Sequence, residues 1–202
     1  MSDPLQLSPQ HFIAEGSERS CFRHPADAGL CVKPMQPPMR PGRLWREMHY
    51  YRGLQRRGVD FRHLARYQGM RNTNLGRANL FELVVDDDGR ISQSLAHYLE
   101  RQDADFNDWA ARQIEQLKQD FYDQWIVCHD FDPTNILVQR LSYDQYRLVV
   151  INGIGRNPLL AFSDFIPACA RSRLVQAWNR RYHQWFAAFP DLLRRLKPYP
   201  SS

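Results

Sequence analysis

The stretch that decides the fold is Cys128-His129-Asp130-Phe131-Asp132-Pro133-Thr134-Asn135-Ile136-Leu137. It follows an apolar run with helical spacing and leads directly into a β-branched segment that is typical of a strand. Within it, the carboxylate of Asp130 and the carboxamide of Asn135 stand five residues apart. The stretch therefore predicts a loop between a helix and a strand, with two oxygen-bearing side chains at a fixed spacing.

Catalytic loops of protein kinases use this spacing. In those loops an aspartate holds the acceptor hydroxyl, and an asparagine five residues later ligates a metal ion. The sequence therefore predicts a catalytic role for Asp130 and a metal-binding role for Asn135.

Composition indicates a globular protein. The chain has 202 residues, of which 43% are hydrophobic and 12% aromatic, enough for one domain or for two small lobes. No apolar run approaches the roughly 20 residues that a membrane-spanning helix needs. The N-terminus lacks the pattern of a signal peptide, and the four cysteines lack paired C-x-x-C spacing. We therefore expect a cytoplasmic protein without a transmembrane segment.

Charge is segregated along the chain behind the net value of +5. Residues 34–77 carry a net charge of +8, residues 78–170 carry −8, and residues 171–202 carry +6. These segments could be solvated faces that attract each other, or an anion-binding surface for phosphates, lipid headgroups or nucleic acid. The sequence leaves both interpretations open.

Periodicity predicts an α+β fold. We expect strands over residues 6–14, 21–24, 30–33, 67–70, 78–85, 136–139 and 147–151, and helices over 42–57, 94–98, 109–126 and from 164 onward. This order favours a sheet-rich half, residues 1–85, followed by a mostly helical half, residues 86–202. The expected fold is therefore a small protein with two lobes. The N-terminal lobe contains a small antiparallel sheet, and the C-terminal lobe is short and helical.

Lys33 and Glu47 form a second candidate group. Lys33 is one of only three lysines beside 24 arginines, and it ends the apolar run of a predicted strand. In the kinase pattern V-A-I-K, such a lysine reaches the nucleotide phosphates and pairs with a glutamate on the next helix. Glu47 lies in the predicted helix 42–57, although a surface pair with a neighbouring arginine would explain it too.

The segment Gly16-Ser17-Glu18-Arg19-Ser20 lies where a kinase-like chain has its phosphate-covering loop. It contains one glycine instead of three, so the backbone could approach a phosphate closely at one point only. An ordinary hairpin turn explains this segment equally well.

Several motifs together resemble a known family. They are Cys-Phe-Arg-His-Pro-x-Asp-Ala at 21–28 with Cys31-Val32-Lys33, Arg46-Glu47-x-x-Tyr50-Tyr51, Asp132-Pro133-Thr134-Asn135-Ile136-Leu137, and Val149-Val150-Ile151-Asn152-Gly153-Ile154-Gly155. The chain resembles the PhoP regulatory network family of YrbL-type proteins over roughly residues 8–170. This resemblance implies membership of the protein-kinase-like superfamily, near the bacterial lipopolysaccharide kinases.

The resemblance also implies ATP and magnesium as cofactors and a role for each matched position. Lys33 and Glu47 would form the phosphate-binding ion pair, and Asp130 would be the catalytic aspartate. The magnesium ligands would be Asn135 and Asn152. Nucleotide-binding positions would be Gly16, Ser17 and Lys33, with Glu82 and Val84 in the segment that meets the adenine edge.

Asn152 departs from the pattern that the resemblance implies. The metal-binding aspartate of a D-F-G or D-G-I-G motif is expected at this position. An amide oxygen can ligate magnesium, but it removes one negative charge from the metal site and would slow phosphoryl transfer. Asp132 offers a spare carboxylate. A turn residue in a favoured Asn-Gly pair is the alternative interpretation.

Two other interpretations have less support. The pair Gly153-x-Gly155 after a strand lacks the third glycine of a dinucleotide fingerprint, and Pro158 follows it. A zinc site would have to use the nearly contiguous residues Cys128, His129, Asp130 and Asp132, and it would lack a distant second ligand cluster.

Three functions remain. The sequence favours a pseudokinase, or a weakly active ATP-binding protein with a regulatory role. The alternatives are an active Mg-ATP-dependent kinase for a small molecule, lipid headgroup or lipopolysaccharide-type sugar, and a non-catalytic module that binds anionic surfaces. No A-P-E motif follows Gly155, so a peptide substrate is not expected. Nucleic-acid-binding signatures are absent as well, and a protein partner is compatible with the regulatory role.

Overall fold

The computed structural model describes residues 3–16, 19–35, 41–101, 103–155 and 166–200. The chain divides into two compact units. Unit 1 comprises Met1–Arg57 with Ala65–Val84, and unit 2 comprises Gly58–Leu64 with Val85–Ser202.

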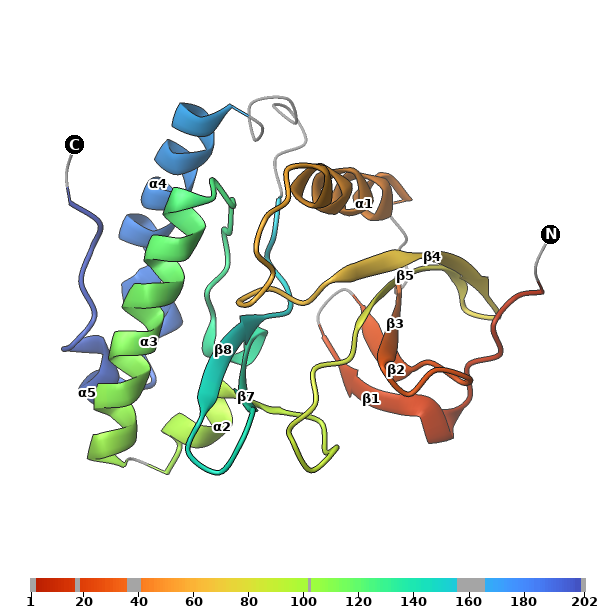
Figure 1. Ribbon diagram of the computed structural model, residues 1–202, viewed down its shortest axis with the longest axis horizontal. Helices are drawn as coiled ribbons and strands as arrows, with labels where there is room; N and C mark the ends of the chain where they lie inside the picture. The colour runs from red at the N-terminus through yellow and green to blue at the C-terminus, as the bar shows by residue number, and fades with distance from the viewer. Residues whose placement is uncertain (1–2, 17–18, 36–40, 102, 156–165, 201–202) are drawn as a thin grey trace. The chain divides into compact units, whose positions relative to one another are not determined.

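Unit 1 contains a five-stranded antiparallel sheet in the order β1-β2-β3-β5-β4 (Figure 1). The strands are β1 (Phe12–Glu15), β2 (Ser20–Arg23), β3 (Leu30–Pro34), β4 (Tyr67–Thr73) and β5 (Gly76–Glu82). The predicted strand over 6–14 is confirmed only for residues 12–14 and is wrong for residues 6–11. A 3-10 helix, η1 (Pro9–His11), lies there, because Pro9 lacks the N–H that a strand ladder needs.

The two faces of this sheet differ in chemistry. Alternation places Phe22, Val32 and Leu80 in one apolar cluster, together with Leu7 and Ala78. Lys33 pairs with Asn79 across β3 and β5, and Cys31 pairs with Phe81, so these four residues lie on the opposite face. The sheet therefore buries Cys31, Lys33 and Asn79 on the face opposite the apolar cluster.

Helix α1 (Pro41–Arg56) packs on this second face. The Tyr51 ring lies 5.2 Å from that of Phe81 and 6.0 Å from that of Tyr67. The apolar stripe predicted by helical spacing is confirmed, since all its members are buried: Leu44, Met48, Tyr51 and Leu54. Burial of this stripe fixes which side of α1 meets the sheet.

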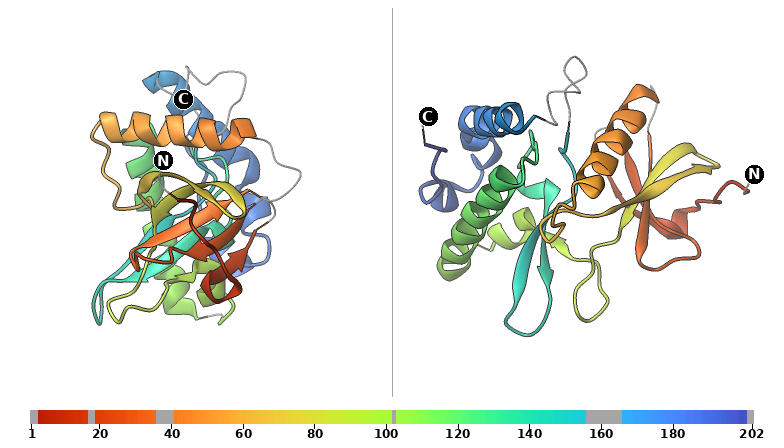
Figure 2. Two further views of the ribbon diagram at one scale, coloured as in Figure 1. Left: turned by 90° about the vertical axis from the view of Figure 1, so that its right-hand side faces the viewer. Right: turned by 45° about the horizontal axis from the view of Figure 1, so that its top comes forward.

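Unit 2 combines a three-stranded antiparallel sheet with helices. Its strands, in the order β6-β7-β8, are β6 (Gln93–Ser94), β7 (Ile136–Arg140) and β8 (Tyr146–Val150). Its helices are α2 (Leu95–Leu99), α3 (Ala104–Asp123), α4 (Pro167–Trp185) and α5 (Pro190–Leu193), with the 3-10 helix η2 (Pro133–Asn135). Helices α3 and α4 lie side by side (Figure 2). The short strand β6 was not predicted.

The ends of α3 set the path into the loop that follows it. Asp103 caps the helix by accepting hydrogen bonds from the backbone N–H groups of Asp105 and Phe106, so the helix begins earlier than the predicted residue 109. Trp125 has a φ of 54°, which ends the helix and turns the chain toward residue 128. The Phe131 ring then packs 5.9 Å from Phe121 and anchors the loop in the core.

The architecture is therefore α+β, with an antiparallel sheet in each unit. No helix within the described parts of the chain combines the length and the apolar character needed to cross a membrane.

Candidate functional site

The loop after α3 holds Asp130 and Asn135 together. The Nδ2 atom of Asn135 donates a hydrogen bond of 2.9 Å to Oδ2 of Asp130. The other oxygen of Asp130 accepts from the backbone N–H of Asp132 at 3.2 Å. Asp132 in turn caps η2, because its Oδ1 accepts from the backbone N–H and the hydroxyl of Thr134. The five-residue spacing thus produces a direct contact between the two predicted side chains.

The exit of β8 pairs with the same loop. The N–H of His129 donates to the carbonyl of Gly153 at 3.0 Å, and the N–H of Gly155 donates to the carbonyl of Val127 at 3.0 Å. The N–H of Ile151 donates to the carbonyl of Asn135 at 2.9 Å. These bonds bring the 151–155 segment, with the exposed Asn152, beside the loop that carries Asp130.

Gly153 is required at its position for two reasons. Its φ is +81°, in the left-handed region that favours glycine. A Cβ atom built there would also lie 2.7 Å from the carbonyl oxygen of Asp130 and 2.8 Å from its Cβ. Only a glycine lets the two segments approach this closely.

The electrostatic environment of Asp130 disfavours its charged form. Burial raises the pKa of this carboxyl group above its ordinary value, and the charge of Asp132 acts in the same direction. The hydrogen bonds from Asp132 and Asn135 and the charge of Arg181 on α4 oppose this rise without cancelling it. Asp130 is therefore a better proton acceptor than an ordinary aspartate.

The oxygen atoms of the side chains in this loop are of the type that binds a hard cation. Asp130 offers a carboxylate, and Asn135 uses its amide nitrogen toward Asp130 while its amide oxygen keeps its lone pairs. Asn152 adds a second amide. Magnesium prefers oxygen ligands of this type, although Asn152 supplies no negative charge. The residues therefore fit magnesium, with one charge fewer than an aspartate at 152 would give.

A soft-metal site is not supported within the described residues. They contain no group of three or more His, Cys, Asp or Glu side chains placed to hold a metal ion. Cys128 is fully buried, and burial raises its pKa far above the ordinary thiol value. Its Sγ donates to the carbonyl of Asp130 at 3.5 Å, so the thiol helps to shape the loop.

In unit 1, Glu47 is a mostly buried carboxylate held by two polar partners. Arg19 donates to its two oxygens at 2.5 and 2.9 Å, and Nδ2 of Asn79 donates to Oε2 at 2.8 Å. Burial by itself would raise the pKa of Glu47, but Arg19, Asn79 and the charge of Lys33 outweigh it. The pKa is therefore lower than usual. This carboxylate is ionised over the whole physiological range.

Lys33 lies on β3 near this carboxylate and is 9% exposed. Its Nζ lies 5.0 Å from the centre of the Phe81 ring, within cation–π range. Arg19 and Asn79 donate hydrogen bonds to Glu47, and the charge of Lys33 also acts on this carboxylate. The sequence suggested either Lys33 or an arginine close in the chain as the partner of Glu47. Arg19, which lies 28 residues before Glu47 in the chain, was not among these candidates.

Gly16, Glu82 and Val84 lie at the ends of unit 1 strands or just beyond them. The N–H of Gly16 donates to the carbonyl of Arg19 at 2.9 Å and closes the turn after β1. Ser17 lies outside the described residues. Glu82 ends β5 opposite Leu30, and Val84 is buried two residues later. Three residues were missed: Arg19, Asn79 and, near Asp130, Arg181. The place of Arg19 within the predicted turn, just before the predicted strand 21–24, was the available signal.

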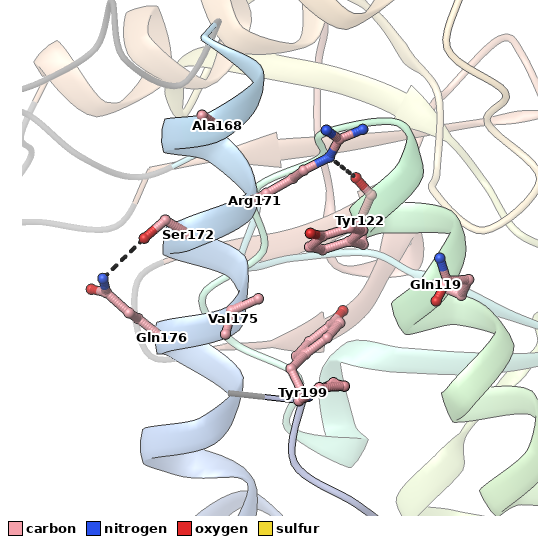
Figure 3. A pocket seen from close by; sticks show the side chains of 9 residues that line it. Gln119, Tyr122, Ala168, Arg171, Ser172, Val175, Gln176 and Tyr199 are labelled. Atoms are coloured by element: carbon pink, nitrogen blue, oxygen red, sulfur yellow. Dashed lines mark hydrogen bonds between the residues drawn. The ribbon is translucent and has the colours of Figure 1, made fainter. Parts of the chain in front are cut away.

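A separate cavity of about 650 Å³ lies between α3, α4 and the C-terminal segment of unit 2 (Figure 3). Arg171 of α4 donates from Nε to the carbonyl oxygen of Tyr122 at 3.1 Å, and its guanidinium lies 5.1 Å from the Tyr122 ring. None of the residues predicted for the site lines this cavity. One arginine of the basic C-terminal segment is therefore used to join α4 to α3.

These observations define an α+β protein whose central feature is a hydrogen-bonded Asp–Asn loop closed against an Asn-Gly segment. The chain belongs to the family described as PhoP regulatory network protein YrbL, whose sequence profile matches residues 5–185. It is 30% identical over 196 residues to the uncharacterized protein YrbL of Escherichia coli strain K12. That alignment covers 96% of this chain and 91% of the relative. The protein of the same description from Shigella flexneri matches to the same extent.

Proposed function

We propose that this protein is a nucleotide-binding member of the protein-kinase-like superfamily with a regulatory role and with weak or absent phosphotransfer. The observation that carries the proposal is the contact between Asp130 and Asn135 in a loop closed against Asn152 and Gly153. This arrangement matches the order and spacing of a kinase catalytic loop and of the metal-binding segment that follows it.

The residues of each unit have separate proposed roles. In unit 1, Lys33 would bind nucleotide phosphates, while Glu47 and its partners hold that face of the sheet in place. In unit 2, Asn135 and Asn152 would hold magnesium. When bound, this ion would neutralise charge on the phosphates. Asp130 would accept the proton of an acceptor hydroxyl group.

Asn152 is the reason for proposing weak or absent catalysis. An amide holds magnesium less strongly than a carboxylate, and phosphoryl transfer depends mostly on electrostatic stabilisation. A regulatory role agrees with the description of the family, which places YrbL in the PhoP regulatory network. A nucleotide sensor needs binding and a conformational response, but no turnover.

An active kinase for a small molecule or a lipopolysaccharide-type sugar is the alternative. The raised pKa of Asp130 favours it, because a stronger base accepts a hydroxyl proton more readily. A protein that only senses nucleotide would gain nothing from a desolvated carboxylate at this position.

The test is a thermal-shift titration with ATP, with and without magnesium, on the wild type and two variants. Binding to the native state raises apparent stability by RT ln(1 + [L]/Kd), so millimolar ATP reveals weak binding. We expect a shift for the wild type, a larger magnesium-dependent shift for Asn152→Asp, and a loss of the shift for Lys33→Met. Asn72→Asp places the same charge on another exposed asparagine and should leave the shift unchanged.

Two results would contradict the proposal. The absence of any ATP-induced shift in both the wild type and Asn152→Asp would remove nucleotide binding. An Asn152→Asp response equal to that of Asn72→Asp would remove position 152 from the metal site. Release of phosphate or transfer to an acceptor by the wild type would instead favour the active kinase.

A further inference from the structure

The cavity between α3, α4 and the C-terminal segment of unit 2 is large enough to hold a small molecule. Its volume of about 650 Å³ falls within the range of about 300–1,000 Å³ that is usual for small-molecule sites. Among the described residues that line it, Arg171 is the single charged residue and none is acidic. The cavity therefore favours a ligand with negative charge.

Arg171 has a fixed position, and its charge is not neutralised by a carboxylate within the described residues. Its Nε donates to the carbonyl oxygen of Tyr122 at 3.1 Å, and its guanidinium lies over the Tyr122 ring (Figure 3). This hydrogen bond uses Nε alone, so both Nη atoms keep their hydrogens for a ligand. Two Nη atoms match the two oxygens of a carboxylate, which suits a ligand with one negative charge.

Two tyrosine rings give the cavity an aromatic wall. The rings of Tyr122 and Tyr199 lie 5.9 Å apart with an angle of 32° between their planes. Tyr199 is held at both ends: its hydroxyl donates to the carbonyl of Lys118 at 2.8 Å, and its N–H donates to Oδ1 of Asn179 at 2.8 Å. Because this wall is already ordered, a planar ligand ring can pack on it at a small entropic cost.

Neutral polar side chains complete the lining. Nε2 of Gln119 donates to Oδ1 of Asp123 at 2.9 Å, and Nε2 of Gln176 donates to the hydroxyl of Ser172 at 3.1 Å. The amide oxygen of each glutamine can still accept a hydrogen bond from a ligand. A phosphate group carries about two negative charges, more than the one cation of the lining balances. A carboxylate is therefore the better match.

We propose that this cavity is a binding site for a small planar aromatic carboxylate. The carboxylate accepts hydrogen bonds from the Nη atoms of Arg171, the ring packs on Tyr122 and Tyr199, and a polar substituent on the ring reaches Gln119. The site shares no residue with the proposed nucleotide site and does not depend on the proposed function.

The first experiment compares two probes on the wild type by equilibrium dialysis. Naphthoate has the aromatic ring and the carboxylate, and naphthamide has the same ring with a neutral amide. We expect naphthoate to bind about tenfold more tightly, because only the acid makes charge-assisted hydrogen bonds to Arg171. Equal affinity for the two probes, or no binding of naphthoate at millimolar concentration, would overturn the proposal.

Two glutamines of α3 offer a matched pair of variants that leave Arg171 in place. Gln116 and Gln119 are both exposed, and each donates to an aspartate four residues later in the chain. Only Gln119 is among the residues that line the cavity. Gln119→Glu sets a negative charge beside the bound carboxylate and should weaken naphthoate binding about fivefold, whereas Gln116→Glu should change it by less than about twofold. Equal weakening in both variants would contradict the proposed location.

Arg171→Gln tests the cation itself, with Arg180→Gln as the control. Arg180 is an exposed arginine of the same helix that does not line the cavity. Arg171→Gln should bind naphthoate no more tightly than naphthamide, and Arg180→Gln should keep the wild-type preference. A preference for naphthoate that survives in Arg171→Gln would overturn the proposal. Arg171 also joins α4 to α3, so if this variant loses both probes, the result with Gln119→Glu decides.

Competition with ATP separates this proposal from the proposed function. Naphthoate affinity should be the same with and without ATP, because the two sites share no residue. Competitive displacement of naphthoate by ATP would place the probe in the nucleotide site and would overturn the proposal. Naphthoate binding by a protein that does not bind ATP would leave this site intact and would count only against the proposed function.

Discussion

Glu47 in unit 1 and Asp130 in unit 2 are both withdrawn from water, yet their pKa values move in opposite directions. The pKa of Glu47 is lowered and that of Asp130 is raised. Glu47 accepts two hydrogen bonds from the guanidinium of Arg19, whereas Asp130 accepts from an amide and a backbone N–H. The difference lies in the partners: a bound cation stabilises a buried carboxylate more than neutral donors do.

This comparison separates two roles. A carboxylate with a paired cation contributes to the stability of the fold and stays ionised. A desolvated carboxylate held by neutral donors costs stability and gains reactivity, which is the pattern of functional sites. Glu47 therefore belongs to the framework of unit 1, whereas the raised pKa of Asp130 agrees with the reactive role that we propose for it in unit 2.

The largest expected effect is the loss of the Glu47 charge. Glu47→Gln leaves the guanidinium of Arg19 without its anion in a mostly buried place, which costs about 3–5 kcal/mol of unfolding free energy. Urea denaturation at pH 7 measures this loss. Asp191→Asn removes a carboxylate from an exposed pair with Arg194 and should cost less than about 0.5 kcal/mol. Equal losses in the two variants would contradict the framework role.

The same variant has a defined pH dependence. A lowered pKa in the folded state stabilises the protein above the unfolded value, near 4.5 for Glu47, and this contribution is lost as the pH falls through the folded pKa. The stability difference between the wild type and Glu47→Gln should therefore shrink below about pH 4.5. A constant difference across that range would assign the loss to packing.

The next effect concerns the close approach of Gly153 to Asp130. Gly153→Ala forces an alanine to a φ of +81° and drives its Cβ against Asp130, so we expect a loss of roughly 2–4 kcal/mol. Gly89→Ala is the matched control, because Gly89 has a φ of +80° and no atom within 4 Å of the added Cβ. It should lose only about 1–2 kcal/mol in the same urea experiment. Equal losses would mean that the contact with Asp130 relaxes without cost.

The smallest expected effect is that of Asp130→Asn. A raised folded pKa gives stability that is complete below the unfolded value, 3.8 for Asp130, and that is lost as the pH rises through the folded pKa. At pH 7 the variant should therefore equal the wild type or exceed it by a few tenths of a kcal/mol, allowing for solvent screening. Melting temperatures from pH 4 to 8 check this. A loss comparable to that of Glu47→Gln would place Asp130 in the framework.

The elements that could be predicted are those with local patterns. The apolar spacing of α1 gave its buried face, and the β-branched runs gave the hairpin of β7 and β8. The predicted first strand extends too far toward the N-terminus, because Pro9 starts a 3-10 helix there. The two-residue strand β6 is too short to show the alternation of polar and apolar residues that marks a strand. It forms because it pairs with the edge of β7.

The contact between Asp130 and Asn135 was determined by the sequence itself, because the two residues are five apart and Asp132 and Pro133 fix the turn between them. The partner of Glu47 was decided only by the tertiary structure. Arg19 is 28 residues away, and their meeting depends on the register of β2 and β3 and on how α1 packs over the sheet. Local spacing encodes contacts within a turn or along a helix face. Contacts between distant segments depend on strand pairing and on burial summed over many residues, which no short motif contains.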